Sequence, residues 1–170
     1  RELINNFNNY KDIDLKINDN ILRDYQVTGV KWLYNIYKCG FGGILADEMG
    51  LGKSIQLIYF LKQVLKEKDA KILIVSPTSL IYNWEAEFDK FGPELKYKVI
   101  AENKTKRQHL LEEIDNTNIF ITTYGLVRQD LERYLNINFE IVVNDEAQNI
   151  KNYNTQMSKA IKKINAHTKI

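Results

Sequence analysis

The sequence has 170 residues, of which 44% are hydrophobic and 27% are charged, which suits one hydrophobic core and not a disordered chain. No apolar run approaches the length of a membrane span and no signal-peptide pattern opens the chain, so we expect no membrane partner. Cys39 is the only cysteine, which excludes an internal disulfide and a thiolate metal cluster and is consistent with a reducing, intracellular compartment.

Residues 1–20 are polar and predict only a lead-in, so we place the globular lobe at 21–170. Apolar residues then recur at helical spacing, and they are Val27, Val30, Leu33 and Tyr37. Gln26 lies near the start of that predicted helix. Its amide pairs a donor with an acceptor, as the N6 and N7 edge of adenine requires. Because a Gly-Lys-Ser segment follows, we favour this role over that of a solvated polar residue.

A short apolar run at 43–46 predicts a buried strand, and a glycine-bearing turn and a helical stripe follow it. Strand, turn, Gly-Lys-Ser and helix form the context of a phosphate-binding P-loop. The expected nucleotide contacts are Asp47, Glu48, Met49, Gly50, Leu51, Gly52, Lys53 and Ser54. Lys53 would supply charge to the β- and γ-phosphates and the Ser54 hydroxyl would ligate Mg²⁺. Asp47 replaces the first glycine of the strict pattern, so a tight turn with a solvated lysine is the alternative.

The remaining chain alternates between strand and helix patterns. The apolar, β-branched run 71–76 predicts a strand that is buried on both faces of a parallel sheet. Further strands are predicted at 97–100, 118–124, 139–144 and 168–170, and helices at 80–91, 105–114, 126–134 and 149–164. This alternation predicts an α/β fold with a doubly wound, mainly parallel sheet and helices on both faces, as three layers.

Hydroxyl side chains stand at or just beyond the ends of two predicted strands. They are Ser76, Thr78, Thr122, Thr123 and Tyr124. Short hydroxyls and helix-starting amides suit contacts with a phosphate backbone, so these residues are candidate nucleic-acid contacts. Near the first strand, Ser79 is also placed to cap the helix 80–91, and both roles can hold at once.

The predicted strand 139–144 ends in two adjacent carboxylates, Asp145 and Glu146. Ligands of open α/β sheets bind at the carboxyl ends of the strands. Asp145 is placed to hold Mg²⁺, directly or through water, as the acidic partner of Ser54. Glu146 is placed to orient or deprotonate the attacking water. A solvated acidic turn is the alternative, and the Gly-Lys-Ser segment in the same chain disfavours it.

The net charge of +2 is too small to indicate a polyanionic partner by itself. Basic residues nevertheless gather in two clusters, one made of Lys104, Lys106 and Arg107 and the other of the lysines from Lys151 onward. A solvated helix face and a nucleic-acid contact explain each cluster equally well.

Taken together, these segments resemble the first RecA-like lobe of the Swi/Snf family of superfamily 2 helicase-like ATPases. The segments that carry the resemblance follow the family's order, and they are 22–26 with 29–33, 43–54, 76–80 with Asn83-Trp84, 122–124 and 145–152. The Asp-Glu-Met-Gly-Leu-Gly-Lys and Asp-Glu-Ala-Gln-Asn-Ile-Lys-Asn runs are the most characteristic. Two departures are Asp24, where the family usually has proline, and Asn144, where an apolar residue is usual.

The resemblance implies an ATP- and Mg²⁺-binding lobe that moves on double-stranded DNA and remodels protein–DNA complexes. It also implies a second RecA-like lobe, whose arginines complete the ATP site, and a coupling role for Gln148. Nucleoprotein or RNA polymerase would be the substrate, in the bacterial cytoplasm and nucleoid or in the eukaryotic nucleus. No motif III precedes the end at Ile170, so we expect a longer protein and little activity from this chain alone.

A competing hypothesis is a nucleotide-dependent module that binds DNA or protein without hydrolysis. Lys53, Asp145 and Glu146 are all present, and these are the residues that the resemblance assigns to hydrolysis, with Lys53 and Glu146 as the catalytic pair. Their presence favours an ATP hydrolase over the binding module.

Overall fold

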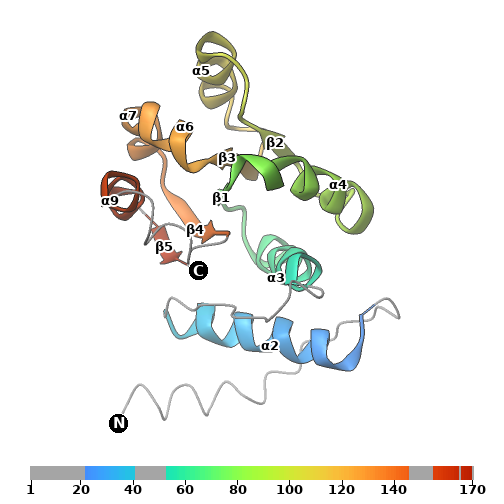
Figure 1. Ribbon diagram of the computed structural model, residues 1–170. Helices are drawn as coiled ribbons and strands as arrows, with labels where there is room; N and C mark the ends of the chain where they lie inside the picture. Colours follow the sequence, from blue (N-terminus) through green and yellow to red (C-terminus); the bar gives the residue numbers. More distant parts are fainter. Residues whose placement is uncertain (1–21, 41–52, 146–154, 165, 170) are drawn as a thin grey trace.

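We describe a computed structural model of the chain at residues 22–40, 53–145, 155–164 and 166–169. Its strands are β1 (Ile72–Ser76), β2 (Tyr97–Val99), β3 (Ile119–Thr123), β4 (Phe139–Asn144) and β5 (Ala166–Lys169). They form a five-stranded sheet in the order β2-β3-β1-β4-β5, in which each pair of neighbours is parallel (Figure 1). The predicted parallel α/β sheet is therefore confirmed.

The helices are α2 (Asp24–Lys38), α3 (Lys53–Glu67), α4 (Ile81–Phe91), α5 (Lys104–Glu112), α6 (Tyr124–Gln129), α7 (Leu131–Leu135) and α9 (Thr155–Lys163). A short 3-10 helix, η2 (Thr78–Leu80), precedes α4. Figure 1 shows α3 on one side of the sheet and α6, α7 and α9 on the other, with α2 on the far side of α3. These are the three predicted layers, with α2 added outside them.

Alternate residues of the central strand β1 serve opposite faces of the sheet. Ile72 and Ile74 belong to a core cluster with residues of α2, α3 and α4. Leu73 and Val75 belong to a second cluster with residues of α5, α6, α7 and α9. All residues of β1 are buried, which explains why the strand reads as a continuous apolar run and not as an alternating one.

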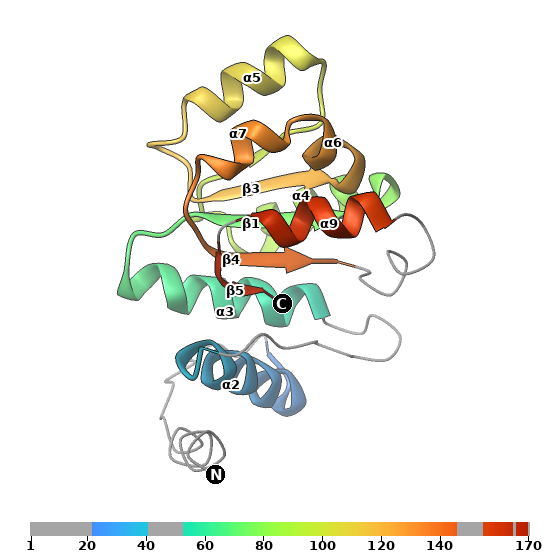
Figure 2. The same cartoon turned by 90° about the vertical axis from the view of Figure 1, so that its left-hand side faces the viewer.

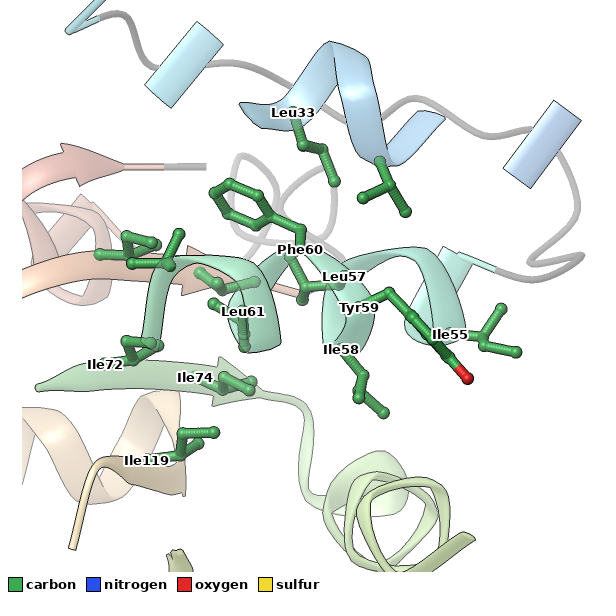
Figure 3. Close-up of a cluster of buried hydrophobic side chains, with 14 of the residues drawn as sticks. Leu33, Ile55, Leu57, Ile58, Tyr59, Phe60, Leu61, Ile72, Ile74 and Ile119 are labelled. Carbon is green, nitrogen blue, oxygen red and sulfur yellow. The ribbon is translucent and has the colours of Figure 1, made fainter. Parts of the chain in front are cut away.

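Helix α3 joins α2 to the sheet. In Figure 3, Leu33 of α2 faces α3 from one side, while Ile72 and Ile74 of β1 face it from the other. Phe60 and Leu61 of α3 are fully buried between these layers. Because α3 is apolar on more than one side, it packs against α2 and against the sheet at the same time.

The carboxyl-terminal half of α2 is linked to strand β4 by hydrogen bonding to Glu140. The Tyr37 hydroxyl donates a 2.5 Å hydrogen bond to Glu140 Oε1, and Lys68 Nζ lies 3.1 Å from the other oxygen of this carboxylate. Although burial of Glu140 raises its pKa, the hydrogen bonds from Tyr37 and Lys68 outweigh that effect and hold the pKa below its ordinary value. The carboxylate is therefore ionised when it bridges α2 and β4.

Some predicted boundaries differ from the structure. The helix predicted at 126–134 is two helices, α6 and α7, which are separated at Asp130. The prediction that Ser79 caps the next helix is wrong, because Ser79 is exposed within η2 and the residue at the α4 N-cap, Leu80, makes no side-chain cap bond. The strand predicted at 43–46 lies outside the described residues.

The first basic cluster is not a single exposed patch. Arg107 is buried and pairs with Asp130, whereas Lys106 is exposed and pairs with Glu102 at 2.8 Å. The structure therefore removes Arg107 from the candidate nucleic-acid surface. No helix in the described parts of the chain is both long and apolar enough to cross a membrane.

Candidate active site

The carboxyl ends of the parallel strands meet at one edge of the sheet. In the register of the sheet, Ser76 of β1 lies beside Thr123 of β3, and Asn144 of β4 lies beside Val75. Figure 2 shows that α3 begins at this same edge. Ser54 lies in the first turn of α3, and Asp145 directly follows β4. Both residues are therefore placed near the edge at which ligands bind in such sheets.

Asp145 is held by hydrogen bonds on both its main chain and its side chain. Its N–H donates to the Val75 carbonyl at 2.8 Å, and its own carbonyl accepts from the Tyr124 hydroxyl at 2.6 Å. The carboxylate oxygen Oδ2 accepts from Trp84 Nε1 at 2.8 Å and from Ser76 Oγ at 3.1 Å. Only 8% of Asp145 is exposed. A buried carboxylate needs such donors, and together they fix its orientation.

This donor set is compatible with Mg²⁺. Hard divalent cations prefer carboxylate, hydroxyl and phosphate oxygens, and Mg²⁺ in phosphoryl-transfer sites uses one or two carboxylates together with substrate phosphates. Asp145 supplies the carboxylate and Ser54 supplies a hydroxyl at the start of α3. No cluster of three or more His, Cys, Asp or Glu occurs among the described residues, so a metal held by protein ligands alone has no site there.

Most of the predicted nucleic-acid contacts use their hydroxyls inside the protein. Ser76 and Tyr124 bind Asp145, as described above. Thr122 is fully buried and donates to the Ile100 carbonyl at 2.7 Å, and Thr123 caps α6 by accepting from Leu126 N–H at 3.2 Å. These geometries disfavour direct contact with a nucleic acid. Thr78, in η2, is exposed and stays a candidate.

Gln26 lies at the start of α2, where its side chain already has a local partner. Gln26 Oε1 accepts from Arg23 N–H at 3.0 Å, and only 7% of the residue is exposed. Nearby, a Cβ on Gly29 would lie 1.9 Å from Gln56 Oε1, the end of a side chain on α3. The glycine thus leaves room for the Gln56 amide in its present position. Contact between Gln26 and adenine stays a prediction.

Some of the other predicted site residues lie outside the residues that the structure describes. Helix α3 begins at Lys53, and Ser54 is half-buried in its first turn. The nucleotide contacts from 47 to 52 lie outside the described residues, as do Glu146 and Gln148. Their roles stay predictions from the sequence.

Trp84 is a site residue to which the sequence reasoning gave no role. It faces the core from α4, with 5% exposed, and its ring lies 6.0 Å from that of Phe88. A buried indole N–H nearly always needs an acceptor. The helical pattern of α4 places Trp84 on the buried face, so the sequence did carry a signal that it would bind a polar group.

Asn144 departs from the apolar residue expected beneath the acidic pair, and we predict that it lowers stability. Within the described part of the chain, its buried Oδ1 accepts no hydrogen bond. Asn144→Val should therefore raise the free energy of unfolding by about 1 kcal/mol, because it removes an unsatisfied acceptor. Denaturant titration measures the change. A clear destabilisation by Asn144→Val would show that the amide contributes a favourable interaction.

The parallel sheet, the start of α3 and the buried aspartate at one edge define the class of this protein, an α/β RecA-like lobe. Residues 25–170 match the model of the SNF2-related domain. The chain belongs to this family, in which it covers the first lobe of the Swi2/Snf2 ATPase core, as the sequence resemblance predicted.

Similar proteins share the lobe but are much longer. An "uncharacterized ATP-dependent helicase" of Mycoplasma pneumoniae is 42% identical over 145 residues, which cover 84% of this chain and 14% of that protein. Helicase swr1 of Aspergillus fumigatus is 43% identical over 141 residues, 79% of this chain and 8% of that protein. The Sulfolobus solfataricus SWI2/SNF2 ATPase core, solved in complex with dsDNA, has a TM-score of 0.78 and 37% identity, and the match covers 88% of this chain and 31% of that one.

Proposed function

We propose that this chain is the ATP-binding first lobe of an SNF2-type DNA translocase, which uses ATP hydrolysis to move on double-stranded DNA and to remodel protein–DNA complexes. The observation that carries the proposal is the fixed, buried carboxylate of Asp145 at the sheet edge where α3 begins. In P-loop ATPases, an acidic residue at this position and a hydroxyl at the start of the helix hold the metal. The names of similar proteins agree with this function.

In this proposal each residue has a separate task at the nucleotide. Ser54 and Asp145 would hold Mg²⁺, which would supply positive charge to the phosphate oxygens. Lys53 places its ammonium beside the β- and γ-phosphates, and Glu146 orients the attacking water. A second RecA-like lobe would supply the arginines that complete the site.

The first test asks whether this chain binds ATP but hydrolyses it only very slowly. We expect the 170-residue chain to bind Mg-ATP weakly and to hydrolyse it negligibly, because an arginine supplied from elsewhere is worth about a thousandfold or more in rate. Calorimetric titration measures binding, and phosphate release with and without duplex DNA measures turnover. Asp145→Ala is the matched variant, and it should lose the metal-dependent part of binding. Robust DNA-stimulated turnover by this chain would overturn the need for a second lobe.

The second test concerns DNA. We expect weak binding to duplex DNA through the backbone, without sequence preference, since a motor that moves on any sequence must not depend on base edges. About two to four phosphate contacts from one lobe would make log affinity fall with log salt at a slope of about −2 to −4. Fluorescence anisotropy with a scrambled duplex at several salt concentrations measures the slope.

Two exposed threonines, Thr78 and Thr28, provide a test variant and its control. Thr78→Ala should weaken DNA binding, because Thr78 is exposed in η2 just beyond β1. Thr28 is also exposed, but it lies on α2 and its hydroxyl donates to the Asp24 carbonyl at 3.1 Å, so Thr28→Ala should leave binding unchanged. Equal losses in both variants, or sequence-selective binding, would remove Thr78 from the DNA path.

A further inference from the structure

Two donors from one short segment converge on a single oxygen of the proposed metal ligand. Ser76 is the last residue of β1, and Trp84 lies near the start of α4. Both side chains donate to Asp145 Oδ2, Ser76 at 3.1 Å and Trp84 at 2.8 Å. Ser76 is fully buried and Trp84 is 5% exposed. The function proposed above assigns no task to Trp84.

We propose that Trp84 is a positioning residue, which acts with Ser76 to hold the Asp145 carboxylate in the orientation that receives the divalent cation. This inference rests on the proposed function, in which Asp145 binds Mg²⁺. Partners that hydrogen-bond to metal-ligating carboxylates orient them and raise metal affinity, and their loss typically weakens metal binding about 10- to 100-fold. Trp84 reaches Asp145 from the helix layer, whereas Ser76 reaches it from the neighbouring strand.

The contact is more specific than core packing requires. Trp84 lies in the core cluster on the α3 side of the sheet and packs against Phe88, and a phenyl ring would fill much of the same space. What phenylalanine lacks is the indole N–H that ends on Asp145 Oδ2. Bonds from both sides leave the buried carboxylate little freedom to rotate. The main chain of Asp145 is separately fixed by Val75 and Tyr124, so the indole N–H acts on the side chain.

The same segment carries the exposed residue that we assign to DNA. Thr78 lies between Ser76 and Trp84 in the chain, in the short helix η2 that directly precedes α4. The two donors of Asp145 therefore flank, in the chain, the turn that we propose contacts DNA.

The test measures metal affinity and not activity. Mn²⁺, a spectroscopic substitute for Mg²⁺, is titrated into the protein with saturating ADP, and free Mn²⁺ is followed by electron paramagnetic resonance. Trp84→Phe should weaken Mn²⁺ binding about tenfold, and Ser76→Ala should weaken it to a similar degree. Phe91→Leu, a change in the same helix at a ring that packs against the same core cluster, should lower the melting temperature but leave Mn²⁺ affinity unchanged. In an Asp145→Asn background, Trp84→Phe should have no further effect.

Each outcome separates the inference from the function on which it rests. Wild-type protein that binds no Mn-ADP would overturn the proposed function and this inference together. Wild-type binding that Trp84→Phe and Ser76→Ala leave unchanged would overturn the positioning role alone. Equal losses of Mn²⁺ affinity in Trp84→Phe and Phe91→Leu would also overturn it, since they would show an effect of general packing. If Trp84→Phe fails to fold, Ser76→Ala decides between these results.

Discussion

Replacing Arg107 with alanine should lower the free energy of unfolding by about 3–5 kcal/mol, because it leaves the carboxylate of Asp130 buried without its partner. Arg107 Nε lies 2.7 Å from Asp130 Oδ2, and Nη2 lies 3.3 Å from Oδ1. The side chains are only 7% and 3% exposed. Arg107 Nη1 also donates to the Glu102 carbonyl at 2.7 Å, so the guanidinium fastens α5 and the preceding turn to the boundary between α6 and α7.

An exposed arginine on α7 provides the control. Arg133 Nη1 lies 3.4 Å from Glu112 Oε1, and the two side chains are 38% and 60% exposed. Arg133→Ala should therefore change stability by less than about 1 kcal/mol. Denaturant titration of both variants measures the difference. Similar small effects would mean that the Arg107 pair is solvated in solution.

A paired replacement tests the same explanation from the other side. Changing Arg107 to Met and Asp130 to Leu removes both charges together and should recover most of the stability that Arg107→Ala loses, because no buried ion remains unpaired. A double variant as unstable as Arg107→Ala would show that packing, and not the uncompensated charge, accounts for the loss.

Arg107 also shows where reasoning from the sequence stops. The sequence placed it with Lys104 and Lys106 in a basic cluster, since all three are close in the chain. Its partner, Asp130, lies in a segment that the apolar pattern predicted as one continuous helix. Arg107 is buried through a long-range contact with Asp130, the residue between the two helices, and a local pattern does not contain that contact.

The strands and the site edge were predictable for a different reason. The run that became β1 is apolar up to its last residue, and those that became β3 and β4 are largely apolar, because both faces of a central parallel strand are buried. Once the strands are parallel, their carboxyl ends must share an edge, so the sequence could place Asp145 at the end of a strand beside the start of α3. Which hydroxyls would turn inward was not predictable, because Ser76 and Thr122 look the same in sequence as the exposed Thr78.

The largest effect on activity should come from Lys53 and Glu146. In a protein that joins this lobe to the second lobe that we propose, Lys53→Ala and Glu146→Gln should each reduce ATP turnover by about a hundredfold or more. Lys53→Ala removes a charge that would neutralise the phosphates in the ground state as well as in the transition state. Glu146→Gln keeps the size of the side chain and loses only the carboxylate that would position water.

These different causes should separate in nucleotide binding. We expect Lys53→Ala to weaken ATP affinity about tenfold or more, since a hydrogen bond to a charged group is worth about 1.5–3 kcal/mol. Glu146→Gln should bind ATP as the wild type does, because the attacking water is not part of the nucleotide. Titration with a fluorescent ATP analogue, alongside single-turnover hydrolysis, measures both quantities. If Glu146→Gln loses affinity as severely as Lys53→Ala, then Glu146 contacts the nucleotide or its metal, and the assignment of water to Glu146 is wrong.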